Sequence, residues 1–299
     1  MATVQPTVIA TLATGGALAD LRNLLFSLAL FNPKPPKVYL YCDEAVVDAL
    51  PGLGYKGEIV TNTAAMARYS GLNRQQMEKM PGQRFPSLWF DFMAEKISLL
   101  KWALLEEGQA CPGVLFCDAD ICFFGPLPQI PVLAHVGLSP HGIRAADEAR
   151  YGRYNGGFVW LTHSRYADAW DAACLAGQRF YEQSALEDVA AAVAAATPAT
   201  GQGALYVFPR TQNFGWWRMW QGERPPAALQ AEWSMNRRKQ PESAGILVEG
   251  EPLGSVHTHF EEQRDAATVA FNNWVLGWLK RLEGGHAPAR RLLGALASR

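Results

Sequence analysis

Short apolar runs alternate with amphipathic stretches along most of the chain, a pattern typical of α/β proteins. The apolar runs predict buried strands over residues 7–13, 38–42, 114–117, 156–161 and 205–208. The amphipathic stretches predict helices over residues 20–31, 92–107, 166–174, 184–196 and 271–282. The chain therefore begins with strand, helix, strand, which is the unit that builds a parallel sheet.

Capping and breaking residues mark several boundaries in this pattern. Asp20 is expected to cap the first helix, and Asn32-Pro33 to end it. A glycine turn at Gly156-Gly157 is expected to lead into the fourth strand. Residues 214–233 are predicted to form a loop with one short helix.

The composition excludes two classes of protein. Apolar residues make up 49% of the 299 residues and charged residues 18%, which excludes a disordered chain. Lys plus Arg number 27 and Asp plus Glu 28, so the basic excess of a nucleic-acid binder is missing. No repeat or strong linker interrupts the pattern. We therefore expect one domain over residues 1–283, followed by a basic tail over residues 284–299.

Cysteine usage and the N-terminal segment bear on the compartment. The five cysteines include no CxxC pair and lie mostly in apolar runs, so reduced buried thiols are expected. No Lys or Arg precedes Arg22, which does not fit the charged start of a signal peptide. No run of 18 apolar residues predicts a membrane span. A cytoplasmic location is the resulting expectation.

The strongest chemical signal is the pair Asp118 and Asp120, which directly follows the predicted strand over residues 114–117. Ligands of open α/β sheets bind outside the carboxyl ends of the strands. Two carboxylates between apolar flanks are costly unless a positive charge neutralises them, and carboxylate oxygens suit Mg²⁺ or Mn²⁺. The pattern therefore favours a metal site that also binds phosphates, with a solvated pair of aspartates in a turn as the alternative.

The strand, Asp118-Ala119-Asp120 and the apolar stretch ending in Gly-Pro-Leu together resemble the metal-binding D-x-D of GT-A fold nucleotide-sugar glycosyltransferases. Further segments resemble that family in order and spacing, closest to its glycogenin-like retaining members. These are VIATLAT, NLLFSLALFNPKPPKVYLYCDE, FMAEK, YNGGF, YEQSAL and VHTHF. The resemblance covers roughly residues 7–260.

This resemblance implies a GT-A type, Rossmann-like nucleotide-binding sheet, mostly parallel, with helices on both faces. The nucleotide-binding part would span about residues 1–125 and the acceptor part about residues 126–283. The implied nucleotide-binding residues are Ala10, Thr11, Thr14, Asp43, Lys96, Asp118, Ala119, Asp120, Gly156 and Gly157. The implied residues of the sugar side are Asn155, Glu182, Gln183 and Asp188. The implied metal ligands are Asp118, Asp120 and a late histidine, with His257 favoured over His259.

Several positions depart from the family pattern or leave a choice open. Glu182 stands where the family has Asp. Lys101 competes with Lys96 as the phosphate contact. Closer relatives carry a Gly and a diphosphate-binding Lys soon after the late histidine, whereas this sequence reads EEQRD, so that Lys is either missing or replaced by Arg264.

The function implied is metal-dependent transfer of a sugar from a nucleoside-diphosphate sugar, with UDP-sugar and retention favoured. Mn²⁺ or Mg²⁺ would be the cofactor. The acceptor would be a carbohydrate, a glycolipid or a protein, and the tryptophans of residues 214–233 suit packing against sugar faces. The basic tail is a candidate contact to anionic lipid at the inner face of the membrane. The alternatives are a sugar-nucleotide-binding protein without catalysis and a haloacid-dehalogenase-like phosphatase.

Overall fold

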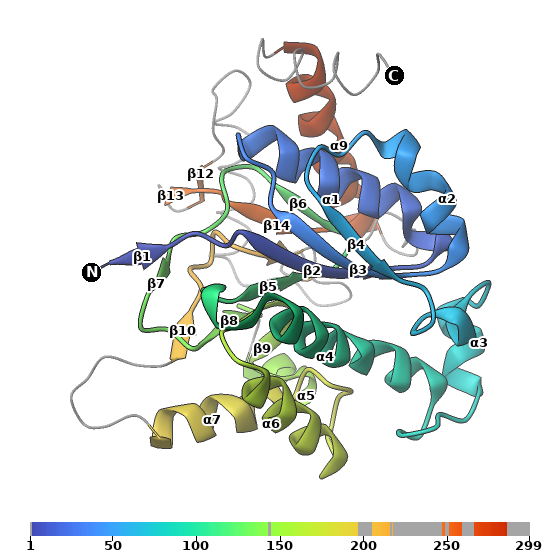
Figure 1. The fold of residues 1–299 in the computed structure, drawn as a ribbon, viewed down its shortest axis with the longest axis vertical. Helices are drawn as coiled ribbons and strands as arrows, with labels where there is room; N and C mark the ends of the chain where they lie inside the picture. Colours follow the sequence, from blue (N-terminus) through green and yellow to red (C-terminus); the bar gives the residue numbers. More distant parts are fainter. Residues whose placement is uncertain are drawn as a thin grey trace.

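The computed structural model describes residues 2–142, 145–196, 205–215, 217, 247–248, 251–258 and 266–285. Its centre is a seven-stranded sheet in the order β10-β8-β9-β5-β2-β3-β4 (Figure 1). The strands are β2 (Val8–Ala13), β3 (Lys37–Cys42), β4 (Ile59–Asn62), β5 (Val114–Cys117), β8 (Val136–Pro140), β9 (Tyr154–Leu161) and β10 (Leu205–Val207). β9 is antiparallel to both neighbours, and the other pairings are parallel.

Helices cover both faces of this sheet (Figure 1). On one face lie α1 (Leu18–Phe31) and α2 (Glu44–Leu53), and on the other α4 (Leu88–Glu107), α6 (Ser164–Leu175) and α7 (Leu186–Ala196). The alternation of β2 explains the two layers, because Ile9 packs in the core with α1 and Ala10 in the core with α4. The predicted α/β fold, with a mostly parallel sheet and helices on both faces, is confirmed.

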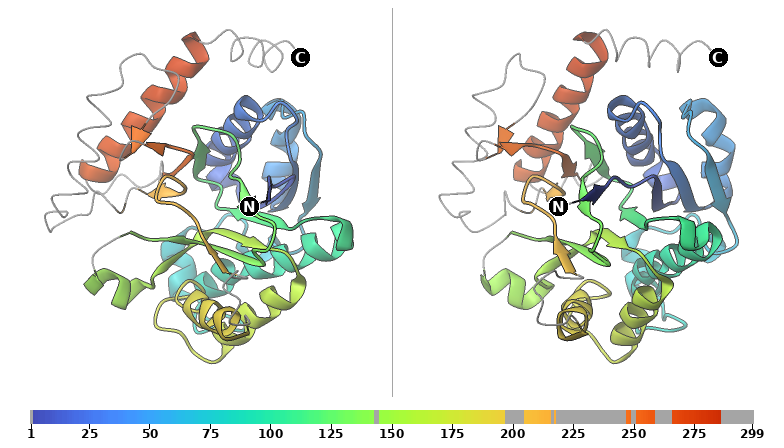
Figure 2. Two further views of the ribbon diagram at one scale, coloured as in Figure 1. Left: turned by 90° about the vertical axis from the view of Figure 1, so that its left-hand side faces the viewer. Right: turned by 60° about the vertical axis from the view of Figure 1, so that its left-hand side comes forward.

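A second, three-stranded sheet brings the segment that follows the aspartate pair next to the segment that ends at His257. It has the order β11-β14-β6, formed by β11 (Phe214–Gly215), β14 (Ser255–His257) and β6 (Ile121–Phe123). β6 is the apolar stretch that follows the aspartate pair, and it contacts α1. Figure 2 shows this sheet and α9 (Ala266–Gly285) on the same side of the large sheet as α1.

The remaining described elements are short. They are β1 (Thr3–Val4), β7 (Ile130–Pro131), β12 (Leu247–Val248), β13 (Glu251–Pro252), α3 (Arg74–Lys79) and α5 (Ala145–Tyr151), with 3₁₀ turns η1 (Gly15–Ala17), η2 (Ala67–Tyr69) and η3 (Gly108–Ala110). β1 pairs with β7, and β12 with β13, both antiparallel.

Two boundary predictions are wrong. Asp20 does not cap α1, because the turn η1 leads directly into the helix and places the N-cap at Ala17, which makes no side-chain cap. Asp20 instead lies buried in the first helical turn. Gly156 and Gly157 do not form a turn before β9 but lie inside the strand, where a side chain would collide with neighbouring side chains.

All five cysteines carry free thiols, as predicted, and burial raises the pKa of Cys42 to about 12. No helix within the described residues is long and apolar enough to cross a membrane. Of residues 214–233, Phe214–Gly215 form β11 and Trp217 is buried, while the others lie outside the described residues. The tail from residue 286 onward also lies outside them.

Candidate metal centre and its surroundings

The turn between β5 and β6 holds the two aspartates at the carboxyl end of β5. The Asp118 N–H donates to the Gly157 carbonyl (2.9 Å), which fastens the turn to β9. The Ile121 N–H donates to the Asp118 carbonyl (3.1 Å) and closes the turn. These backbone bonds fix the turn that carries both carboxylates.

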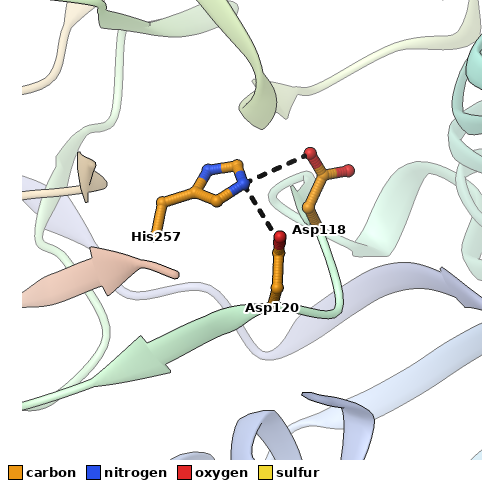
Figure 3. A group of neighbouring side chains, drawn as sticks. All are labelled: Asp118, Asp120 and His257. Atoms are coloured by element: carbon orange, nitrogen blue, oxygen red, sulfur yellow. Dashed lines mark ion pairs between the residues drawn. The ribbon is translucent and has the colours of Figure 1, made fainter. Parts of the chain in front are cut away.

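β14 brings His257 to this turn from 137 residues further along the chain, because it pairs antiparallel with β6 and sets His257 opposite Ile121. Both the N–H and the hydroxyl of Thr258 donate to the Asp120 carbonyl, at 2.9 and 2.7 Å. His257 Nε2 then lies 3.0 Å from Asp120 Oδ1 and 3.8 Å from Asp118 Oδ2 (Figure 3).

The donor set of this cluster fits a divalent cation. One ligand atom from each of Asp118, Asp120 and His257 lies within 4.8 Å of the others, and His257 is buried. Burial would lower the pKa of His257, but the Asp120 and Asp118 carboxylates hold it above its usual value. A site that favours positive charge on an imidazole also favours a cation, and its two carboxylates are ligands that suit Mn²⁺ or Mg²⁺.

Lys96 supplies a fixed cation beside the cluster. Its side chain is fully buried in α4, with Nζ 2.8 Å from Glu182 Oε1 and 3.5 Å from Asp118 Oδ1. Burial opposes its charge, yet the two carboxylates raise the pKa of Lys96 overall, so the ammonium form is kept. Lys101 instead reaches Asp168 on the exposed side of α4, at 2.6 Å. Of the two candidate lysines, Lys96 is therefore the one that lies beside the metal cluster.

Glu182 is held by the segment that precedes α7. Tyr181 has a left-handed backbone (φ 42°), and the Trp170 indole donates to the Glu182 carbonyl at 2.7 Å. Burial raises the pKa of the Glu182 carboxyl, and Lys96 opposes this rise. Non-glycine residues with positive φ cost free energy and cluster at functional sites.

The start of β9 joins Asn155 to Gln183. The Gln183 Oε1 accepts from the Gly156 N–H (3.1 Å) and from Asn155 Nδ2 (3.2 Å), and its Nε2 donates to the Tyr151 carbonyl. Asn155 Oδ1 accepts from the Gly157 N–H at 3.0 Å. Four of the residues expected on the sequence resemblance, Asn155, Gly156, Gly157 and Gln183, therefore form one bonded group.

Residues 156 and 157 of β9 are glycines, and a side chain at either position would collide with residues of the site. A Cβ on Gly157 would lie 2.3 Å from Asp118 Oδ2 and 2.6 Å from His257 Cε1. A Cβ on Gly156 would lie 2.7 Å from Glu182 Oε1. All three distances are far below van der Waals contact, so the absence of side chains at 156 and 157 leaves room for Asp118, His257 and Glu182.

Gly157→Ala is expected to separate Asp118 from His257 and weaken Mn²⁺ binding at least tenfold, about 1.4 kcal/mol. Gly156→Ala is the matched control, because its methyl group meets Glu182 and not the metal cluster. Isothermal titration calorimetry measures the Mn²⁺ affinity of both variants. Equal Mn²⁺ affinity in the two variants would contradict this explanation.

The other expected site residues lie on several elements around the carboxyl ends of the strands or, for Asp188, on the surface of α7. Ala10 and Thr11 are buried in β2, Ala119 is buried in the turn, and Thr14 is the N-cap of η1. Asp43 caps α2 and accepts from the Gly15 N–H at 3.0 Å, at the carboxyl ends of β2 and β3. Asp188 is exposed on α7 and accepts from Gln178, away from Lys96. His259 lies outside the described residues.

Asn213 and His141 belong to the site without having been foreseen, and Trp217, foreseen as one of the tryptophans suited to sugar faces, lies against His257. Asn213 bonds to His257, and the Trp217 ring lies edge-on to His257 with 4.9 Å between ring centroids. The Trp217 indole donates to the His141 carbonyl, and His141 Nε2 lies 3.4 Å from Asn155 Nδ2. The sequence signal at Asn213 is a set of polar residues directly before an aromatic run, and His141 has no comparable signal.

Comparisons with models of known protein families and with curated protein sequences find no match. Solved structures of GT-A-type glycosyltransferases are similar in fold. They include apo mouse xyloside xylosyltransferase 1 (TM-score 0.47, 12% identity, covering 86% of this chain and 99% of that one) and the galactosyltransferase LgtC with donor and acceptor sugar analogs (0.47, 13%, 97% and 95%). Another is the apo glycosyltransferase GlyE of Streptococcus pneumoniae TIGR4 (0.49, 11%, 92% and 64%). Identities this low carry no activity over to this chain.

Proposed function

We propose that the chain is a metal-dependent glycosyltransferase that takes a sugar from a nucleoside-diphosphate sugar. The observation that carries this proposal is the convergence of Asp118, Asp120 and His257 at the carboxyl end of β5, beside the buried ammonium of Lys96. Such an edge of an α/β sheet is where ligands bind, and a cation there pairs with phosphates. The sequence resemblance supplies the sugar nucleotide, with UDP-sugar favoured.

The roles of the residues follow from charge. Asp118, Asp120 and His257 would hold Mn²⁺ or Mg²⁺, which acts when bound as a Lewis acid on the diphosphate. Transfer breaks the bond between the anomeric carbon and the diphosphate, so negative charge grows on the leaving group. The Lys96 ammonium, 3.5 Å from Asp118 Oδ1, would add a second positive charge that stabilises the leaving group.

The sugar side is assigned to the group around β9. Asn155 and Gln183 present amides beside the cluster, and Glu182 contributes a buried carboxylate bonded to Lys96. A carboxylate there opposes the positive charge that develops on the sugar in an oxocarbenium-like transition state. Retention of configuration, the nature of the acceptor, a single domain over residues 1–283 and a cytoplasmic location remain predictions.

The test is a thermal-shift panel of nucleoside diphosphates and sugar nucleotides, each with and without Mn²⁺. Binding to the folded state stabilises by RT ln(1 + [L]/Kd), so UDP with Mn²⁺ should raise the unfolding temperature clearly, and UDP alone little. Nucleotide binding that survives EDTA unchanged would contradict the metal site.

Two further outcomes separate the alternative functions. A protein that binds UDP with Mn²⁺ but releases no sugar from any donor would be a sugar-nucleotide-binding protein. Release of inorganic phosphate from phosphomonoesters, without sugar transfer, would favour a phosphatase.

A further inference from the structure

Asn213 occupies an unusual position beside the metal cluster. It is fully buried, precedes β11 and has a left-handed backbone with φ 53°. Within the described residues, Tyr181 is the other non-glycine residue with positive φ, and it precedes Glu182. The Asn213 N–H donates to the Ser255 hydroxyl at 2.8 Å, which ties the residue to β14.

The side chain of Asn213 contacts both halves of the site. Its Nδ2 lies 3.0 Å from Asn155 Oδ1 and 3.1 Å from Ser139 Oγ. Its Oδ1 lies 3.0 Å from His257 Nδ1. Asn213 therefore connects the imidazole of the metal cluster to the amide that begins β9.

The direction of each hydrogen bond in this chain is fixed from one end. The Gly157 N–H can only donate, so the atom of Asn155 that it meets is the oxygen. That oxygen can only accept, so the atom of Asn213 facing it is the NH₂ group. The other terminal atom of Asn213 is then the oxygen, and it requires a hydrogen on His257 Nδ1.

This order has a consequence for the metal cluster. A neutral imidazole with its hydrogen on Nδ1 has its lone pair on Nε2. Nε2 is the atom that faces Asp120 Oδ1 and Asp118 Oδ2. Hydrogen bonds to the second nitrogen of a ligating histidine fix its tautomer and ring orientation, and losing them typically weakens metal binding by about 10–100-fold.

We propose that Asn213 is a positioning residue that fixes the Nδ1–H tautomer of His257, so that Nε2 is presented to the cation, and at the same time orients Asn155. The proposal rests on the proposed function: the tautomer of His257 bears on the metal site alone, and the orientation of Asn155 bears on sugar transfer. The side-chain amide of Asn213 thus holds His257 of the metal cluster and Asn155 of β9 in a fixed relative position.

The test compares Asn213→Gly with Asn213→Asp. Glycine adopts the left-handed backbone without strain, so Asn213→Gly removes the amide alone. It should weaken Mn²⁺ binding about 10–100-fold and release the His257 ring to a mixture of tautomers. Asn213→Asp keeps an acceptor for Nδ1–H, so Mn²⁺ affinity and tautomer should be retained. It loses the donation to Asn155, so the turnover of sugar transfer should fall.

The readouts are Mn²⁺ titration and the ¹⁵N signals of His257 in the metal-free protein, at a pH where the imidazole is neutral. Asn32→Ala is the control, because Asn32 is also buried and bonded through its side chain to Leu28 and Leu127 but lies outside the site. It should lower stability and leave both readouts unchanged. Wild-type Mn²⁺ affinity or an unchanged tautomer in Asn213→Gly would overturn the proposal. Wild-type protein that binds no Mn²⁺ would refute the metal site itself, and the tautomer signals would still decide the role of Asn213.

Discussion

Asp118→Asn and Asp120→Asn are each expected to lower the turnover of sugar transfer about 1,000-fold, because a metal contributes several kcal/mol and each 1.4 kcal/mol is tenfold. Each variant loses a charged oxygen that lies within 4 Å of His257 Nε2. The added stabilisation that Mn²⁺ gives to UDP-bound protein should disappear with it. Turnover with a radiolabelled sugar nucleotide and thermal shifts with Mn²⁺ measure the two effects.

Asp168→Asn is the matched control, because Asp168 is exposed and pairs with Lys101 on α6's outer side. It should leave turnover and the Mn²⁺ effect unchanged. The two site variants should also remain folded, since the turn is held by backbone bonds from Asp118 and Ile121. An Asp120→Asn protein with normal Mn²⁺-dependent turnover would rule out this cluster as the metal site.

Glu182→Gln is expected to destabilise the fold by about 3–5 kcal/mol, the usual cost of removing one partner of a buried ion pair. Lys96 and Glu182 are both nearly inaccessible, and their charged atoms lie 2.8 Å apart. The substitution leaves the ammonium with Asp118 alone, at 3.5 Å. Urea unfolding measures the loss, and the double variant Lys96→Met/Glu182→Gln should recover part of it.

The single variant Glu182→Gln should also lower the turnover of sugar transfer at least tenfold, about 1.4 kcal/mol. From sequence, Glu182 belongs to the sugar side and a change there would spare nucleotide affinity. In the structure it shares Lys96 with Asp118, so UDP affinity should fall as well. Stability and turnover that both match the wild type would remove Glu182 from the site.

The sequence predicted best those parts whose signal is local. The apolar run that ends at Cys117 and the aspartates after it mark β5 and its carboxyl end without further information. The local sequence does not show which of Lys96 and Lys101 faces the site. Both lie on α4, and at 3.6 residues per turn they point about 140° apart. Only the packing of α6 against α4 shows that Lys101 faces outward to Asp168.

Asn213 shows what sequence patterns cannot supply. Its role depends on a left-handed backbone and on three partners that lie 44 to 74 residues away along the chain. No periodicity encodes such contacts. Gly157 is a similar case. A glycine pair predicts a turn, yet here glycine is needed because Asp118 and His257 leave no room for a side chain.

The small sheet β11-β14-β6 has a consequence for local opening. β6 follows the aspartates directly, whereas His257 arrives on β14, held by a three-residue register. Short strand pairings of this kind can open locally without unfolding the whole domain. A cation bound by Asp118, Asp120 and His257 would link β14 to the turn before β6 and oppose this opening. The protection of the Val256 amide against hydrogen exchange would then measure how stably the late segment of the chain is held against the early one.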